Sequence, residues 1–174
     1  MSILQTLYVF LPALTANAAP VLLSNVTLVR RYNRPLWTAA FGSHKTWIGF
    51  IGGTIVGAAT ALLQFFVHGA PLLADFTAPY ASVASSVAWG ALLGVGALTG
   101  DTVKSYFKRR LRIPPGGALP VIDGMDHMIG ALLFTWPLYA PPVWHVVVLL
   151  ALSPLLSLAA NSFSYLVGWK DRWY

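Results

Sequence analysis

The sequence predicts an all-α polytopic membrane protein, and three observations support this prediction. Of the 174 residues, 57% are hydrophobic and 9% are charged, whereas a soluble domain carries about a quarter charged residues. The mean hydropathy is +0.68. Apolar runs of about 20 residues, long enough to cross a bilayer as helices, recur between the charged segments. This composition excludes an ordinary cytosolic enzyme and a disordered chain, and the lack of cysteine excludes a disulfide-stapled module.

Five apolar runs divide the chain, which we treat as one integral-membrane domain over residues 1–174. Charge-free stretches define the first two runs. The third ends at Asp101, from which a helix is expected to continue to about residue 112. The fourth run is short and stops at a pair of prolines, so it must begin near Ile122 in order to span. The predicted spans are about 3–28, 46–67, 82–100, 122–140 and 143–167.

Basic residues indicate on which side of the membrane each connection lies, because Lys and Arg remain in the cytoplasm. All eleven Lys and Arg fall in the loop 29–45, the loop 101–126 and the C-terminal tail. The connections 68–81 and 141–142 carry none. Five spans with the N-terminus outside and the C-terminus in the cytoplasm satisfy this distribution.

A stripe of polar residues follows the third span. Asp101, Lys104, Ser105, Lys108 and Arg112 are spaced so that they share one face of a continuous helix. Such a face suits a polyphosphate with its metal, because the carboxylate binds Mg²⁺ while the cations neutralise phosphate oxygens. A collar of basic residues that only fixes the topology is an equally good explanation for the cations. It leaves Asp101 unexplained.

A second group of acids opens the fourth run. Asp123 and Asp126 are three residues apart and share a helix face, near a helix N-terminus where the macrodipole favours anions. Together with Asp101 they are candidates for a nest of three carboxylates around one or two Mg²⁺ ions. The alternative is a capping role, with Asp123 as the N-cap and Asp126 in the first turn. Both roles can hold together.

Polar residues also stand at the start of the second span and inside the first. Lys45 and Thr46 at a helix N-terminus form a plausible phosphate contact. Asn17 is polar at lipid depth and must face protein, in an interhelical hydrogen bond or toward a ligand. In the third span, Gly90 and Gly94 have the spacing of a helix-packing pair. Alternatively, Gly94 forms part of the wall of an opening for lipid chains.

Three motifs, in order, resemble those of the CTP-dependent phosphatidate cytidylyltransferases. The chain has KTWIGFIGG from Lys45, GDTVKSYFKR from Gly100 and PVIDGMD from Pro120. That family has a KTW-x-G-x-x-GG segment, a GD-x-x-x-S-x-x-KR segment and a downstream aspartate pair in the same order. Its archaeal branch, the CDP-archaeol synthases, fits best, because their short five-helix form suits this length. The run LPALTANAAP from Leu11 also resembles the archaeal N-terminal pattern.

This resemblance implies an enzyme that transfers CMP from CTP to 2,3-bis-O-geranylgeranylglyceryl phosphate, an isoprenoid ether lipid phosphate, giving CDP-archaeol and pyrophosphate. It implies that Asp101, Asp123 and Asp126 bind Mg²⁺ at the cytoplasmic face of the cell membrane. CTP, the lipid phosphate and membrane lipid are the expected partners, and no nucleic acid is expected. Met125 departs from the bacterial pattern, which has arginine there. The residues implied to contact CTP or the lipid phosphate are Lys45, Thr46, Lys104, Ser105, Lys108 and Arg109.

Other functions are weighed against this one. A small transporter predicts ionisable groups near mid-membrane, and no predicted span carries one. A non-catalytic scaffold whose basic loops bind anionic lipid explains the charge bias but not the three aspartates. Within the enzyme class, the alternatives are a CDP-diacylglycerol-type synthase that uses an acyl lipid phosphate, and a kinase or transferase acting on another lipid phosphate or polyprenol.

Overall fold

The computed structural model is helical and describes residues 2–68, 70, 76, 81–114, 117, 119 and 122–169. Within these residues no strand forms, and extended segments meet only in an isolated bridge between Pro35 and Thr46. The all-α prediction is therefore confirmed for this part of the chain. The helices are α1 (Ile3–Ser24), α2 (Thr27–Tyr32), α3 (Thr38–Phe41), α4 (Trp47–Val67), α5 (Val83–Arg110), α6 (Ile122–Thr135) and α7 (Val143–Leu166).

Each predicted span corresponds to one helix, with differences at the ends. The first helix stops at Ser24, before the predicted end at residue 28, and the short α2 follows it. The fourth run gives only the 14 residues of α6, which ends at Thr135 rather than near residue 140. Helix α5 ends at Arg110, and Arg112 beyond it has a φ of 57°. Arg112 therefore leaves the helix and does not continue the polar stripe.

Capping side chains fix where α4 and α5 begin. The Thr46 hydroxyl accepts a hydrogen bond from the backbone N–H of Gly49 at 3.1 Å, which satisfies one free donor of the first turn of α4. Ser82 and Ser85 form a reciprocal capping box at the start of α5. Three basic residues fill the last turn of α5, where cations offset the negative end of the helix dipole. Helix α5 thus runs for 28 residues and carries the polar stripe to the end of the bundle.

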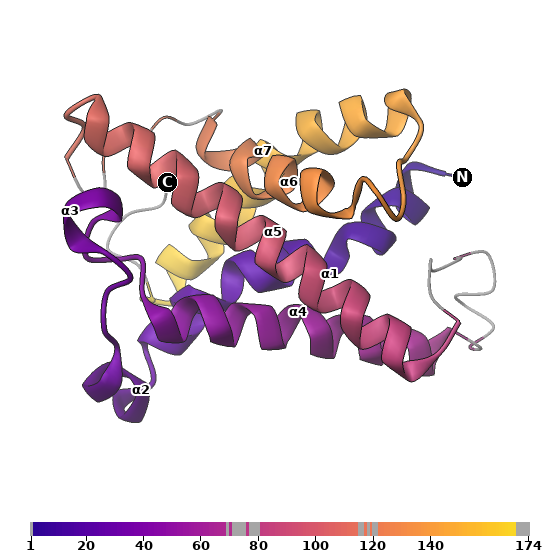
Figure 1. Cartoon of the computed structure of the whole chain (residues 1–174), viewed down its shortest axis with the longest axis horizontal. Coiled ribbons are helices and arrows are strands. Elements are labelled where there is room, and N and C mark those ends of the chain that lie inside the picture. Colours follow the sequence, from indigo (N-terminus) through magenta and orange to yellow (C-terminus); the bar gives the residue numbers. More distant parts are fainter. Residues whose placement is uncertain are drawn as a thin grey trace.

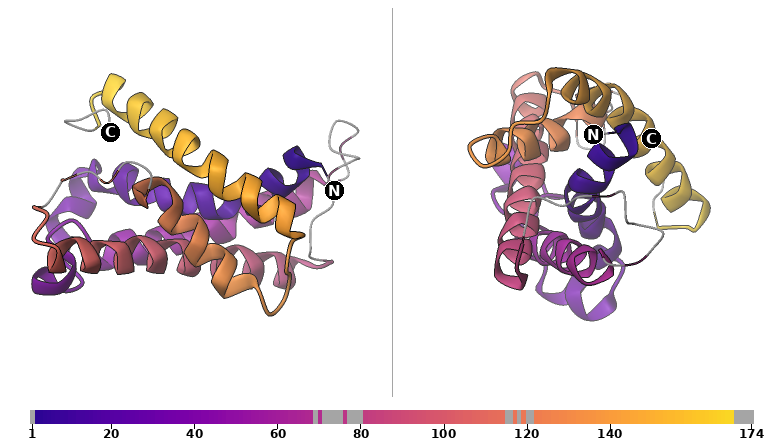
Figure 2. Two further views of the ribbon diagram at one scale, coloured as in Figure 1. Left: turned by 90° about the horizontal axis from the view of Figure 1, so that it is seen from above. Right: turned by 90° about the vertical axis from the view of Figure 1, so that its right-hand side faces the viewer.

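Helix α5 runs across the front of the bundle in Figure 1 and along one side of it in Figure 2. It packs against α4 and α6, while α1 packs against both α4 and α5, and α7 lies against α6 (Figure 2). Phe10, Leu93, Met128 and Leu149 belong to the apolar core that these helices enclose. Lipid is as apolar as this core, so the packing contributes mainly through van der Waals contact between closely fitted helices.

Glycines allow the helices to approach closely. A Cβ on Gly90 of α5 would collide with the backbone carbonyl of Gly57 on α4. A Cβ on Gly94 would lie 3.0 Å from the Cα of Thr54, with Ala16 of α1 close behind. The glycines of the third span therefore pack helices, as the first of the two sequence hypotheses predicts. The lipid-opening hypothesis for Gly94 does not hold, because this residue is buried between neighbouring helices.

Four helices in the described part of the chain are long and apolar enough to cross a membrane, namely α1, α4, α5 and α7. Large apolar side chains such as Leu63 and Leu155 are about 60% exposed on their surfaces. Apolar surface of this extent is rare on soluble proteins and is normal against lipid. The chain is therefore a polytopic helical membrane protein.

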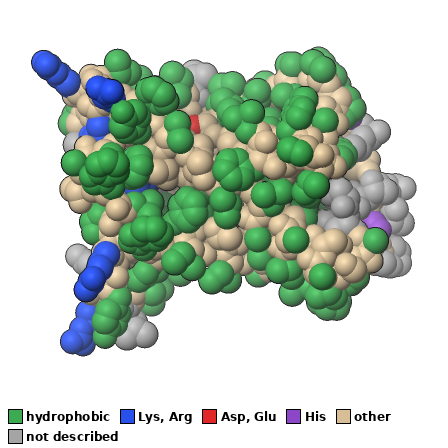
Figure 3. Space-filling model, viewed as in Figure 1, with side chains coloured by type: hydrophobic (Ala, Val, Ile, Leu, Met, Phe, Trp, Pro, Cys, Tyr) green, Lys and Arg blue, Asp and Glu red, His purple; other side chains and the backbone are tan. Residues whose placement is uncertain are grey.

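The described lysine and arginine side chains gather at one end of the molecule (Figure 3). The rest of that face carries mainly apolar side chains. This distribution agrees with the charge pattern of the sequence. Helix α6 is shorter than the length that crosses a bilayer unaided, so the fifth span and the orientation in the membrane remain predictions.

Candidate active site

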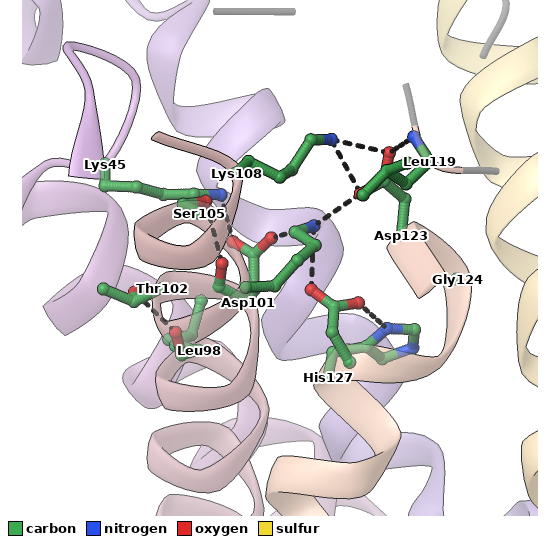
Figure 4. Close-up of polar contacts among 12 residues, drawn as sticks. Lys45, Leu98, Asp101, Thr102, Ser105, Lys108, Leu119, Asp123, Gly124 and His127 are labelled. Carbon is green, nitrogen blue, oxygen red and sulfur yellow. Dashed lines mark hydrogen bonds and ion pairs between the residues drawn. The ribbon is translucent and has the colours of Figure 1, made fainter. Parts of the chain in front are cut away.

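Three aspartates and three lysines form one cluster of ion pairs where α4 and α6 begin and α5 nears its end, and most of them are labelled in Figure 4. Two of the lysines and one aspartate lie on α5, two aspartates lie on α6, and the third lysine directly precedes the cap of α4. All six were predicted site residues, and the structure brings them together. The members of this Lys–Asp cluster are Lys45, Asp101, Lys104, Lys108, Asp123 and Asp126.

Lys104 is shared by all three carboxylates of the Lys–Asp cluster. Its Nζ lies 2.8 Å from Oδ1 of Asp101, 2.8 Å from Oδ2 of Asp126 and 3.5 Å from Oδ1 of Asp123. One ammonium therefore links a carboxylate on its own helix to two carboxylates on α6. The Lys104 side chain is only 14% exposed.

Each of the other two lysines holds one aspartate. Lys45 pairs with Oδ2 of Asp101, and Nζ of Lys108 lies 2.8 Å from both carboxylate oxygens of Asp123. The backbone N–H of Leu119 donates a further hydrogen bond to Oδ2 of Asp123 at 2.7 Å. Both oxygens of Asp101 and of Asp123 therefore have partners within the protein.

The Lys–Asp cluster is electrically balanced, since three ammonium groups face three carboxylates. Its members are largely buried, and the Asp126 side chain is only 5% exposed. A buried charge without a partner is strongly unfavourable, and mutual pairing removes most of that cost. The balance explains how six ionised groups can lie beside an apolar helical bundle. It also means that a charged ligand must exchange partners with groups that are already paired.

Close packing of α5 on α6 sets the distance between the acids. A Cβ on Gly100 would collide with the backbone carbonyl of Asp126, and a Cβ on Gly130 would collide with that of Gly96. Two helices approach this closely only where neither has a side chain at the contact. Because Asp101 directly follows Gly100, the same contact brings the carboxylates of Asp101 and Asp126 to opposite sides of one ammonium.

A buried histidine contacts Asp126 on its other oxygen. Nδ1 of His127 lies 3.5 Å from Oδ1 of Asp126, and Nε2 lies 3.3 Å from Oγ of Ser153 on α7. The Ser153 hydroxyl donates to the backbone carbonyl of Gly124. Sequence reasoning assigned no role to His127 and did not identify Ser153. The position of His127 next to Asp126 was the available signal, whereas nothing in the sequence indicates that Ser153 reaches α6.

Three other candidates use their side chains in local structure. Thr46 caps α4, as described above. The Ser105 hydroxyl donates to the backbone carbonyl of Asp101 at 2.9 Å, and Nη2 of Arg109 donates to the carbonyl of Pro114 at 3.2 Å. In the described part of the chain, none of these three side chains hydrogen-bonds to a carboxylate of the Lys–Asp cluster.

Asn17 lies half-buried on α1. Among the residues that the structure describes, its side chain makes no hydrogen bond, either to the Lys–Asp cluster or elsewhere. The interhelical hydrogen bond that was one of its two predicted roles is therefore not formed here.

A small cavity of about 30 Å³ adjoins Lys45 and Asp101, with Pro20, Phe50 and Thr102 among the residues that line it. This volume holds about one water molecule. A nucleotide can therefore enter only if the groups around the cavity move.

A larger, apolar groove of about 520 Å³ opens between α6 and α7. Met125, which lines the groove, lies between Asp123 and Asp126 in the sequence. The lining residues of the groove are Met125, Val147, Leu150, Ala151, Pro154 and Leu155.

The donor chemistry of the three carboxylates suits magnesium, which prefers oxygen ligands at about 2.0–2.1 Å. In the structure the three carboxylates lie farther apart than ligands of one metal ion would. Over the described ranges, no three acidic or histidine side chains stand close enough together to hold a metal ion. Instead, Asp101, Asp123 and Asp126 surround the ammonium of Lys104. The ligands are thus of the right kind, and they would have to draw inward around a metal.

Comparisons with known proteins agree with this architecture. The family model of the CarS-like CDP-archaeol synthases matches residues 1–174. The CDP-archaeol synthase of Thermococcus onnurineus is 36% identical, over 98% of this chain and 96% of its own. The CDP-archaeol synthase of Pyrococcus horikoshii is 35% identical, over 97% of this chain and 95% of its own. A solved structure of an intramembrane enzyme for archaeal membrane lipid biosynthesis is 31% identical and has a TM-score of 0.72, covering 92% of this chain and 94% of that chain.

Fold and relatives together define a membrane-embedded cytidylyltransferase. The chain belongs to the CDP-archaeol synthase family. The family resemblance inferred from the three motifs is confirmed, and so is the prediction that the chain is an enzyme. These matches decide against the transporter and the scaffold.

Proposed function

We propose that the chain transfers CMP from CTP to 2,3-bis-O-geranylgeranylglyceryl phosphate in a Mg²⁺-dependent reaction that gives CDP-archaeol and pyrophosphate. Membership of the family supports CTP-dependent formation of CDP-archaeol. The Lys–Asp cluster is the observation that supports its location, because three carboxylates and three ammonium groups meet at the end of an apolar bundle. Joining a soluble nucleotide to a lipid phosphate needs both kinds of charge at this boundary.

The aspartates are the proposed metal ligands. In this proposal Asp101, Asp123 and Asp126 hold Mg²⁺, which when bound neutralises charge on the triphosphate. The three proposed ligands come from two helices, since α5 supplies one carboxylate and α6 supplies two. His127 holds the second oxygen of Asp126 and orients that carboxylate toward the site.

The lysines are the proposed phosphate ligands. Lys45, Lys104 and Lys108 exchange their carboxylate partners for phosphate oxygens of CTP or of the lipid. Each ammonium donates in three directions as a compact point charge, which suits phosphate oxygens in several orientations. Both reactants are polyanions, so this neutralisation is what lets them approach each other. Four further residues are proposed to contact CTP or the lipid phosphate when it is bound: Thr46, Ser105, Arg109 and Asn17.

The proposed reaction is a displacement at phosphorus. An oxygen of the lipid phosphate attacks the α-phosphorus of CTP, the bond from that phosphorus to the bridging oxygen breaks, and pyrophosphate leaves with the bonding electrons. The attacking phosphate is already ionised near neutral pH, so no side chain has to remove a proton. The protein contributes alignment of attack with departure, together with charge neutralisation.

We place this site at the cytoplasmic face of the cell membrane, with α6 as a short fifth span and the N-terminus outside. The gathering of basic side chains at the end that carries the Lys–Asp cluster supports this orientation. CTP would then reach the site from the cytosol.

The groove between α6 and α7 is the proposed place for an isoprenoid chain of the lipid. It is lined by apolar side chains, among them Met125, which stands between the two aspartates of α6 in the sequence. A lipid phosphate bound at the Lys–Asp cluster could extend a chain into this groove without leaving the leaflet.

The proposal is tested by incubating purified protein with labelled CTP, Mg²⁺ and a panel of lipid phosphates. The panel holds the unsaturated isoprenoid diether, its saturated form, a diacyl phosphatidate and a polyprenyl phosphate. We expect nucleotide-labelled lipid, with the unsaturated diether used best. Preference for the diacyl lipid would favour the CDP-diacylglycerol-type alternative. Failure to label any lipid would contradict the proposed activity.

A further inference from the structure

Lys104 differs from the other lysines of the Lys–Asp cluster in the number of its partners. Its Nζ contacts Asp101, Asp123 and Asp126. In the described part of the chain, Lys45 pairs with Asp101 alone and Lys108 with Asp123 alone. The Lys104 ammonium therefore occupies the point on which the carboxylates of α5 and α6 converge.

A divalent metal held by the same carboxylates would need this space. The oxygens lie 2.8–3.5 Å from Nζ of Lys104, whereas Mg²⁺ takes its oxygen ligands at about 2.0–2.1 Å. Carboxylates drawn in to that distance leave no room for an ammonium between them. Two cations at one point would also repel each other strongly in a largely buried site. Occupation by Lys104 and occupation by a metal therefore exclude each other.

The ammonium also offsets the repulsion among the three carboxylates. Asp101 and Asp126 face each other across the tight contact between Gly100 and the Asp126 backbone. Without a cation between them, carboxylates at this separation disfavour each other's ionised form and push the two helices apart. Lys104 supplies that cation from within the chain.

We propose that Lys104 is a built-in counter-ion, which holds the three carboxylates together while the site is empty and moves to the triphosphate when metal and nucleotide bind. This inference rests on the proposed function, in which the aspartates bind Mg²⁺. A metal entering alone must displace the ammonium and therefore binds weakly. The triphosphate offers the ammonium a new partner, so metal and nucleotide favour each other's binding.

Binding of Mn²⁺, a paramagnetic substitute for Mg²⁺, tests this without turnover. The wild type, Lys104→Met and Arg110→Met are titrated with Mn²⁺ in the absence of nucleotide, and free Mn²⁺ is followed by electron paramagnetic resonance. Methionine keeps an unbranched chain of similar length without the charge. Arg110 is a matched control, because it lies exposed on the same helix and contacts Tyr106 rather than a carboxylate.

We expect Lys104→Met to bind Mn²⁺ about tenfold more tightly than the wild type, or better, since removal of a nearby positive charge strengthens cation binding. Arg110→Met should bind like the wild type. Thermal melting gives a second readout. In chelator, Lys104→Met should melt below the wild type, and Mn²⁺ should raise its Tm more than that of the wild type. Lys104→Arg, which keeps the charge, should show neither effect.

Measurable Mn²⁺ binding by Lys104→Met that is no tighter than that of the wild type would overturn the inference and leave the magnesium site of the proposed function standing. An equal gain in Arg110→Met would also overturn it, because overall charge would then explain the effect. Absence of bound Mn²⁺ in Lys104→Met, with the protein folded, would contradict the magnesium site itself, and the inference would fall with it.

Discussion

The backbone of Gly100 on α5 lies directly against the carbonyl of Asp126 on α6, with no space for a side chain between them. Asp101 follows Gly100, so this contact between two helices fixes the separation of two carboxylates. Both then lie 2.8 Å from the ammonium of Lys104. The geometry of the charged site thus depends on a residue that has no charge.

Gly100→Ala should push α5 away from α6 and disrupt the Lys–Asp cluster. Forcing extra volume into a packed contact costs about 1–3 kcal/mol, so we expect a lower Tm and a large loss of cytidylyl transfer. Gly52→Ala is the control, because its added methyl would meet the end of the flexible Leu23 side chain, which can turn away. If Gly100→Ala were as stable and active as the control, the helix contact would not determine the site.

Replacement of a site aspartate by asparagine should abolish turnover and leave a folded protein. Asparagine keeps the volume of Asp101, Asp123 or Asp126 and removes the charge that binds metal. Loss of an outer-shell partner alone costs about 10–100-fold in metal affinity or activity, and we expect a larger loss for a ligand. Circular dichroism in detergent checks folding and labelled CTP checks turnover. An Asp101→Asn variant that kept most of its activity would refute the metal assignment.

Variants of Thr46 distinguish its role as the N-cap of α4 from a role as a phosphate ligand. In the structure the Thr46 hydroxyl accepts a hydrogen bond from the Gly49 N–H. Loss of such a cap lowers the free energy of unfolding by about 0.5–2 kcal/mol. Thr46→Ala should therefore lower the Tm, and Thr46→Ser should restore it. Melting with and without CTP is the measurement. An unchanged Tm with weakened CTP binding would instead identify the hydroxyl as a phosphate ligand.

Ala151→Phe should block the groove between α6 and α7. The added ring takes the place proposed for an isoprenoid chain, so the KM for long-chain lipid phosphate should rise several times more than the Kd for CTP. Leu158→Phe, on the same helix but outside the groove lining, is the matched control. Parallel loss of lipid use and CTP binding would mean that the bundle was damaged, and the groove assignment would be wrong.

Much of the fold could be predicted from the sequence, because long apolar runs leave few alternatives to membrane helices. Helices α4, α5 and α7 begin and end within a few residues of the predicted spans. Helix α6 is shorter than predicted, since hydropathy shows where a run is apolar and not where the helix unwinds. The lipid opening was sought at Gly94, although that glycine is covered by Thr54 of α4.

The members of the Lys–Asp cluster could be predicted from the sequence, and the contacts between them could not. Charged residues at the end of an apolar run stand out in the sequence, which is why Asp101, Asp123 and Asp126 were found. Their convergence on Lys104 depends on how α5 and α6 pack, which spacing within one helix does not reveal. The contact of His127 with Ser153 depends on α7 in the same way.

The most direct test of the proposed activity follows two labels of CTP into lipid. Purified protein is incubated with Mg²⁺, the isoprenoid diether phosphate and CTP that carries ³²P at either the α or the γ position. Cytidylyl transfer predicts that the α label enters the lipid and that the γ label is recovered in pyrophosphate. Entry of the γ label into lipid would indicate a kinase, and absence of both labels from lipid would contradict the proposed activity.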